Sequence, residues 1–303
     1  RVLHGRHALA LSVGAMVGWG WVVMSGEWIL RGGSAGAALA FAAAGAAILL
    51  IALLYAELAS AMPEVGGEHV YSHRALGPIG SFFCTWSIIF VYVGICCFEA
   101  VGLATVVDYV DIDLKRVPLW NIAGYQVYLT WALIGVFGSV AVTFVNVLGV
   151  KQSAVFQVVF TLIILAAGVL LFTGAMLHGS LENLDPLFPE SRAGILSVMM
   201  LAPFFFVGFD VIPQAAEEIK LPFKNIGWLI VFSVLLVIVW YCLVTLAVSA
   251  LLDNEMLASS NLPTADANKV AWGELGASIL ILGGISGIIT SWNAFVVGGS
   301  RAI

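Results

Sequence analysis

Eight long apolar runs decide what this chain can fold into. They cover residues 8–30, 35–62, 78–107, 125–148, 153–178, 194–219, 226–252 and 275–300. About 20 apolar residues in a helix are enough to cross a bilayer, and in lipid every backbone polar group must find a partner within the protein. Of the 303 residues only 10% are charged and 61% are hydrophobic, whereas soluble domains carry about 25% charged residues. The sequence therefore predicts an all-α integral membrane protein with about eight transmembrane helices.

Two of these runs carry helix-breaking residues near their middle. In the first, Gly18 and Gly20 flank Trp19; in the sixth, Gly208 lies beside Asp210 between two prolines. A charged residue at this depth is costly in a continuous spanning helix, but it is tolerated where an interrupted helix lines a polar cavity. Two interrupted helices in corresponding places are the best sequence indication of a transporter's central site. We therefore predict that helices 1 and 6 are broken and bind one small solute between them.

The expected chemistry of the first break is that of exposed backbone. Free N–H groups of the downstream half favour a carboxylate, and free carbonyls of the upstream half favour an ammonium group. Gly18 and Gly20 let the backbone approach a ligand closely because they lack a side chain. The alternative is ordinary packing of small residues between membrane helices.

The second break adds aromatic rings and a carboxyl group. Phe205, Phe206 and Phe209 either close over a bound solute or pack in the core. Asp210 needs a partner or a proton at this depth. It either contacts the solute or ties the interrupted backbone together through a structural hydrogen bond.

Other classes of protein find little support. The four cysteines lie in apolar runs without the spacing of a zinc or redox motif. His69 and His73 are four residues apart, but no third ligand lies near them, so no metal site and no cofactor are expected. Serine and cysteine lack a nearby base, which argues against an enzyme. A net charge of -6 does not indicate nucleic-acid binding.

Lysine and arginine predict the orientation of the chain. Cytoplasmic loops of membrane proteins carry more of these residues. An inside N-terminus places seven basic residues inside and five outside. We therefore expect a cytoplasmic N-terminus.

Several motifs resemble the amino acid–polyamine–organocation (APC) superfamily, and more closely its bacterial amino acid permeases and their ethanolamine-permease relatives. They are GFDVIPQAAEEIKLP, YAELASAMPEVGGEHVYSHRALGP, SWNAFVVGGSRAI and the glycine-rich first helix. The resemblance implies the LeuT-type fold of two inverted five-helix repeats. Residues 1–180 would form helices 1–5, and residues 181–303 helices 6–8 of a partial second repeat. The chain then looks truncated after the eighth helix.

The resemblance also implies which residues bind the substrate. The Gly18–Gly20 turn would hold a carboxylate, and carbonyls near Ala15, Met16, Phe205 and Phe206 would take an amino group. In relatives a small residue often stands where this chain has Trp19, which could shrink the pocket or shift the carboxylate contact. The implied set is Ala15, Met16, Gly18, Trp19, Gly20, Glu99, Phe205, Phe206, Gly208, Phe209, Asp210 and Trp292.

Two further implications concern ions. Some proton-coupled relatives carry a lysine where this chain has Ile164, one turn from Thr161, whereas Thr290 and Ser291 resemble a hydroxyl pair that binds sodium. This favours sodium coupling or plain exchange; the alternative is that such hydroxyls bond to helix carbonyls. Glu99 is a proton carrier, a counter-ion for a cationic substrate, or a neutral acid bonded to a neighbour.

The predicted function is secondary active transport of amino acids across the bacterial cytoplasmic membrane by alternating access. Helices 1, 2, 6 and 7 would rock against a scaffold, as in a symporter or antiporter, with Na⁺ or H⁺ as the possible second solute. The alternatives are an amine permease for ethanolamine or a polyamine, and a membrane protein that keeps the fold without transporting. The expected partners are the substrate and the lipid bilayer; the oligomeric state stays open.

Overall fold

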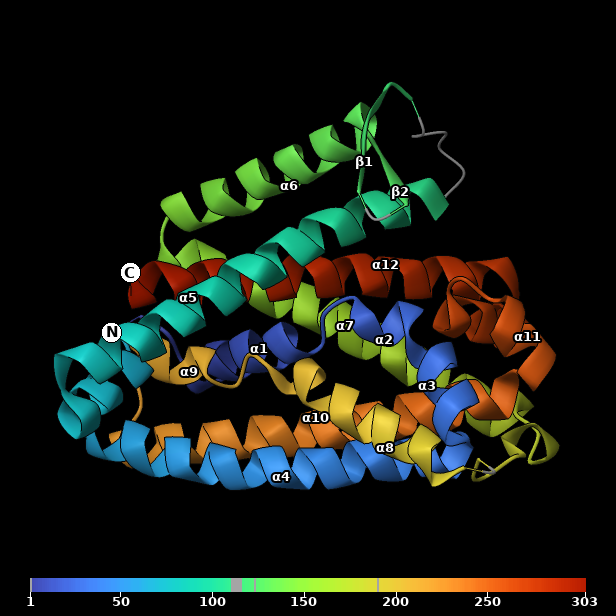
Figure 1. Cartoon of the computed structure of the whole chain (residues 1–303), viewed down its shortest axis with the longest axis horizontal. Helices are drawn as coiled ribbons and strands as arrows, with labels where there is room; N and C mark the ends of the chain where they lie inside the picture. Colours follow the sequence, from blue (N-terminus) through green and yellow to red (C-terminus); the bar gives the residue numbers. More distant parts are fainter. Residues whose placement is uncertain (1, 110–115, 123, 190) are drawn as a thin grey trace.

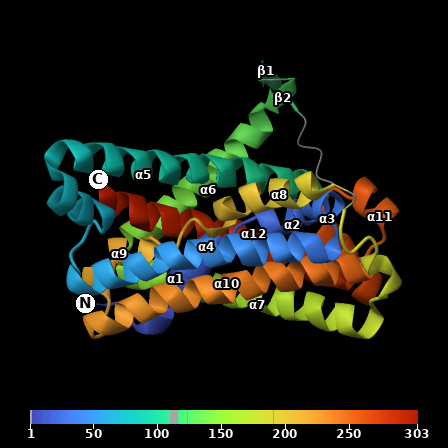
Figure 2. The ribbon, with the colours of Figure 1, turned by 60° about the horizontal axis from the view of Figure 1, so that its bottom comes forward.

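The computed structural model describes residues 2–109, 116–122, 124–189 and 191–303. Long helices lie side by side along one direction in both views (Figures 1 and 2). In the described part of the chain, seven spans are long and apolar enough to cross a membrane. Six of them are built on α4 (Ser34–Ala61), α5 (Glu68–Tyr109), α6 (Leu129–Val147), α7 (Val150–His178), α10 (Phe223–Leu251) and α12 (Pro263–Ala302).

The remaining two predicted runs contain several short helices each. The first consists of α1 (Gly5–Met16), α2 (Gly20–Val23) and α3 (Ser25–Gly32), so no single helix there is long enough to count as a span. The sixth consists of α8 (Arg192–Leu201), the 3₁₀ turn η2 (Ala202–Phe206), α9 (Val211–Gln214) and the 3₁₀ turn η3 (Ala216–Glu218). Its part Arg192–Gln214 is the seventh span.

Glycines set the ends of two long helices. Gly77 in α5 and Gly273 in α12 have φ of 73° and 69°, a conformation that glycine adopts without strain. Each helix is kinked at its glycine. The predicted starts at residues 78 and 275 therefore mark the helices that follow these two kinks.

Small residues allow α4 and α10 to lie close together along most of their length (Figure 2). A Cβ atom at Gly45 would lie 2.4 Å from Ile238, and one at Gly227 would lie 2.6 Å from the Ala56 carbonyl oxygen. Lipid offers no hydrophobic force between helices, so such close contact is what holds them together. The alanine-rich second run is a packing helix for this reason.

The predicted start of the fourth helix at residue 125 is wrong. Residues 125–128 instead form the strand β2 (Tyr125–Tyr128), which pairs antiparallel with β1 (Pro118–Ile122). Tyrosine and valine in β2 and tryptophan and isoleucine in β1 are residue types that favour strands, and Gly124 takes a φ of 87° in the turn. The loops predicted near 180–193 and 253–273 likewise contain a 3₁₀ turn, η1 (Glu182–Leu184), and a helix, α11 (Asn254–Ser259).

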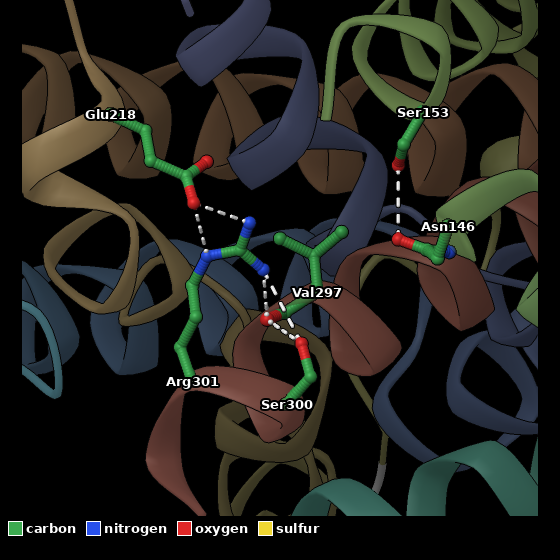
Figure 3. A network of polar contacts seen from close by, with 6 residues as sticks. All are labelled: Asn146, Ser153, Glu218, Val297, Ser300 and Arg301. Atoms are coloured by element: carbon green, nitrogen blue, oxygen red, sulfur yellow. Dashed lines mark hydrogen bonds and ion pairs between the residues drawn. The ribbon is translucent and has the colours of Figure 1, made fainter. Parts of the chain in front are cut away.

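The end of the molecule that carries the N-terminus is closed around Glu218. The backbone amides of Val2 and Leu3 donate to the Glu218 carbonyl oxygen at 2.8 and 2.9 Å, and the Lys220 amide donates to Leu3. The Glu218 carboxylate accepts from Arg301 Nη2 at 2.7 Å and Nε at 3.0 Å (Figure 3). Glu218 therefore joins the N-terminus, the end of the sixth run and α12.

Candidate functional site

A small cavity of about 30 Å³ lies where the first and sixth runs meet. This volume holds about two water molecules. Residues of α1, α2, α5, α10, α12 and the sixth run surround it. Its lining consists of Ala15, Met16, Gly18, Trp19, Gly20, Ile95, Phe98, Glu99, Phe204, Phe205, Val207, Tyr241, Ser291 and Phe295.

The two interrupted runs touch each other at Gly208. This residue has a φ of 128°, and a Cβ atom added to it would lie 2.5 Å from Ala15 Cβ and 3.1 Å from the Ala15 carbonyl carbon. Glycine is needed here for its backbone conformation and for the close approach. Gly208 therefore positions the wall of the cavity without lining it.

Backbone groups beside the cavity are left without partners. In the described residues, the amides of Gly18 and Trp19 and the carbonyls of Phe205 and Phe206 make no hydrogen bond. The Met16 carbonyl oxygen differs, because it accepts from the Tyr241 hydroxyl at 2.8 Å. Buried backbone groups are normally paired, so these free groups mark a place where a polar ligand fits.

Glu99 brings a carboxyl group to the same place. It is 2% exposed, and its Oε2 atom has no partner among the described residues. A Cβ atom at Gly18 would lie 2.8 Å from Glu99 Oε1 and 3.3 Å from Ser291 Oγ. Glycine at position 18 thus keeps the carboxyl group and the hydroxyl group next to the bare backbone.

The indole of Trp19 fits between two glycines on neighbouring helices. A Cβ atom at Gly284 of α12 would lie 2.4 Å from Trp19 Cζ3, and one at Gly102 of α5 would lie 3.3 Å from Trp19 Cδ1. The large side chain at the position where relatives often have a small one is therefore housed between α5 and α12, with only part of it facing the cavity.

Eight of the residues singled out from the sequence line the cavity, and seven do not. Asp210 points away: its Oδ1 accepts from the Gly208 amide at 2.9 Å and its Oδ2 accepts from the Tyr92 hydroxyl. These are the bonds expected of a carboxylate that ties the interrupted backbone together. The seven residues outside the lining are Thr161, Phe206, Gly208, Phe209, Asp210, Thr290 and Trp292.

The aromatic members of that set pack against other helices. Phe209 lies edge-on to Tyr55, with ring centroids 5.3 Å apart, and Phe206 lies against Tyr241 at 6.0 Å. Trp292 fills the space beside Gly138 of α6, where a Cβ atom would lie 2.7 Å from the indole.

The candidate ion ligands already have protein partners. Thr290 Oγ1 donates to the Gly287 carbonyl at 3.1 Å, within its own helix, and Thr161 Oγ1 donates to the Ala10 carbonyl at 3.3 Å. Between them, Gln157 Nε2 donates to the carbonyls of Ala10 and Thr290 at 3.2 and 3.1 Å. The neutral amide of Gln157 therefore bonds to carbonyl oxygens beside both threonine hydroxyl groups. In the described residues no group of three His, Cys, Asp or Glu side chains could hold a metal ion.

Sequence reasoning missed the apolar half of the cavity and the glutamine. Ile95, Phe98 and Phe295 lie in predicted spans, where the sequence does not show which apolar side chain faces a cavity and which faces lipid. Gln157 did carry a signal, because an uncharged polar residue inside a spanning helix usually bonds across helices.

A multi-pass helical membrane protein with two interrupted segments in contact at a small cavity has the architecture of a solute carrier. The family model for amino acid permeases matches residues 7–303. The chain belongs to this family and therefore has the fold of the APC superfamily.

Individual relatives are distant but match along most of the chain. The chain is 25% identical to the branched-chain amino acid permease BcaP of Bacillus subtilis (strain 168), over 97% of this chain and 64% of the relative. It is 26% identical to the methylthioribose transporter of the same organism, over 96% of this chain and 63% of the relative. It is also 26% identical to the gamma-aminobutyric acid permease of that organism, over 74% of this chain and 47% of the relative. The chain spans less than two thirds of the length of these relatives.

Proposed function

We propose that this protein is a permease that carries amino acids across a membrane by alternating access. The observation that carries the proposal is the set of unbonded backbone groups at Gly18, Trp19, Phe205 and Phe206 beside a buried carboxyl group. Membership of the amino acid permease family supports it, as do the printed names of the relatives. The Bacillus subtilis relatives support a bacterial cytoplasmic membrane as the location. The excess of basic residues on the predicted inner side supports an N-terminus on the cytoplasmic side.

The proposed binding mode follows from the lining. The free amides of Gly18 and Trp19 take the substrate carboxylate, as donors positioned for an anion. The carbonyls of Phe205 and Phe206 take the ammonium group, with Glu99 as counter-charge. The rings of Phe98 and Phe295 surround an apolar side chain.

The cavity is too small for an amino acid in this conformation. At about 30 Å³ it lies well below the 300 Å³ or so of an ordinary ligand pocket. Substrate entry therefore requires the two interrupted runs to move relative to α5 and α12. In this proposal the structure represents a closed state of the cycle, and helices 1, 2, 6 and 7, which come from both sides of the two-repeat division at residue 180, move against the remaining helices.

For the second solute we propose exchange rather than sodium coupling. Gln157 supports this because its amide nitrogen already binds the carbonyls of Ala10 and Thr290. Thr161 and Thr290 then serve as helix contacts, and Ser291 serves the substrate pocket. A sodium gradient that drives uptake into proteoliposomes would overturn this part.

An amine permease is the second candidate, and the free Oε2 atom of Glu99 favours it. An amine without a carboxylate needs a counter-ion and does not need the amides of Gly18 and Trp19. The two candidates therefore differ in the compounds that the protein should take up, amino acids or amines.

A direct test uses the full-length protein in proteoliposomes with a radiolabelled panel of amino acids and amines. We expect saturable uptake of a radiolabelled amino acid, and we expect unlabelled amino acids of similar structure to compete with it. Gly18→Ala should lower this uptake at least about tenfold, equivalent to about 1.4 kcal/mol, because its Cβ would lie 2.8 Å from Glu99. The control is Gly94→Ala, whose Cβ meets nothing within 4 Å. Saturable uptake of amines instead of amino acids, lost in Glu99→Gln, would favour the second candidate; no saturable uptake of any compound would reject both.

A further inference from the structure

A second buried carboxyl group lies outside the cavity, at the start of α5. Glu68 is 4% exposed, although it belongs to the most polar stretch of the chain. Its Oε2 atom accepts from the side-chain amide of Gln214, and the Tyr55 hydroxyl lies within hydrogen-bonding reach of the carboxyl group. Among the described residues, Glu68 Oε1, Gln214 Oε1 and the Tyr71 hydroxyl are buried without a hydrogen bond of ordinary geometry. The transport mechanism proposed above uses none of these groups.

No cation compensates Glu68. In the described residues it makes no ion pair, whereas its neighbour Glu64 is bonded to Arg74 at 2.6 Å. Four titratable groups face Glu68, and none of them can carry a positive charge: Tyr55, Tyr71, Tyr92 and Asp210. A buried carboxylate without a cation costs several kcal/mol, and a second carboxylate nearby adds repulsion.

The Glu68 contact joins the end of the sixth run to the start of α5, two parts that move apart in the transport cycle proposed above. Gln214 belongs to α9, after the interruption in the sixth run, while Glu68 precedes the kink of α5. The neighbouring Gly67 has a φ of 41° and would place a Cβ 3.3 Å from the backbone of Pro213 and Gln214. This junction lies at the end of the molecule that carries the N-terminus (Figure 1). Opening of that end would separate Glu68 from Gln214 and expose the carboxyl group to water.

We propose that Glu68 is a proton-binding site that holds a proton while this end is closed and releases it when the end opens. In the closed state a protonated carboxyl group donates to an oxygen of its neighbourhood, for which the free Gln214 Oε1 is suited after rotation of the amide. In the open state hydration stabilises the carboxylate. No bond other than the O–H bond forms or breaks, and water is the acceptor of the proton.

The sign of the pH effect follows from linkage. Because the open state binds fewer protons, raising the pH on the side that carries residue 68 favours opening. One linked proton changes the open-to-closed ratio by up to about tenfold per pH unit. The proposal rests on the transport cycle proposed above, since opening of this end is a step of that cycle.

The test is exchange of a substrate by the full-length protein in proteoliposomes, with the pH on each side varied separately. Wild-type exchange should rise with pH on the side of residue 68. Glu68→Gln fixes the charge of the protonated state, so exchange should stay at the low rate that the wild type shows at low pH and should lose this dependence. The matched control is Glu64→Gln, four residues earlier on the exposed surface, which should keep the wild-type profile.

The outcomes separate the two proposals. Wild-type protein that exchanges no substrate rejects the proposed function, whereas exchange with the same pH profile in wild type and Glu68→Gln rejects the proton site alone. If Glu68→Gln does not fold, Glu68→Asp keeps a titrating group in a shorter side chain and should shift the profile along the pH axis. An unshifted profile in Glu68→Asp would count against the proposal.

Discussion

Gly208 holds the two interrupted runs at contact distance. Its φ of 128° and the 2.5 Å separation between an added Cβ and Ala15 leave no place for a side chain. At this position one hydrogen atom decides how closely two backbones approach.

Gly208→Ala should therefore destabilise the protein. Backbone strain contributes about 1–3 kcal/mol, and overpacking against Ala15 adds a similar amount. Thermal unfolding of purified protein in detergent measures this, with Gly94→Ala as the glycine replacement in open space. Equal midpoints for the two variants would contradict the described contact.

Trp19 and Gly284 should show strong energetic coupling. Gly284→Ala places a methyl group 2.4 Å from the indole and should lower stability in the wild type by about 1–3 kcal/mol. In a Trp19→Ala background the same change should cost little, because the space is then empty. A double-mutant cycle on unfolding free energies measures the coupling, and additive effects would show that the indole lies elsewhere.

Among the elements, the closure at Glu218 connects the N-terminus to α12. The side chains of Glu218 and Arg301 are 26% and 14% exposed, and the Arg301 Nη1 also donates to the Val297 carbonyl. This pair is more shielded than the exposed pair of Arg31 and Glu27. It therefore depends less on solvent screening.

Glu218→Gln should loosen this closure. A hydrogen bond to a charged group is worth about 1.5–3 kcal/mol, so the open form should become markedly more populated. Alkylation of a cysteine placed at Leu11, which lines the 310 Å³ cavity beneath the pair, should speed up. Glu27→Gln, which breaks the exposed pair, is the control; unchanged alkylation in Glu218→Gln would contradict a closing role.

His7 gives the same end a dependence on pH. It lies just before the first predicted span, and its Nδ1 accepts from the His4 amide. Burial, and then the positive charges of Arg6 and His4, lower the pKa of His7. At low pH the unfolded chain therefore binds a proton at His7 more readily than the folded chain does. The stability of the folded chain then falls as the pH drops below about 6.5, the ordinary pKa of histidine. Unfolding midpoints of His7→Gln should depend less on pH between about 5 and 7, whereas those of His178→Gln, at an exposed histidine, should follow the wild type.

The sequence patterns predicted the positions of the helices better than they predicted the direction in which individual side chains point. The spans were evident because length and apolarity are properties of a whole segment, and the glycines at 18 and 208 marked where backbone matters. Asp210 shows the limit: its charge at mid-depth indicated importance, but only the fold shows that it bonds to Tyr92 and Gly208. The strand at 125–128 was missed because its apolar residues merged with the helix that follows.

At the scale of the whole molecule, the N-terminus lies at the left end in Figure 1, whereas the hairpin β1–β2 projects at the top, right of the centre. This arrangement makes the proposed orientation testable. In a variant without its four native cysteines, a cysteine at His73 should react with an impermeant reagent only from the inside, and one at Leu119 only from the outside. Both positions are exposed. The reverse pattern would invert the proposed orientation.

The 30 Å³ cavity between the interrupted runs also has a consequence for pharmacology. A compound shaped to this void would be smaller than any amino acid. If the proposed transport cycle is correct, an effective blocker must instead hold the two interrupted runs apart from α5 and α12, so screening should use an open conformer.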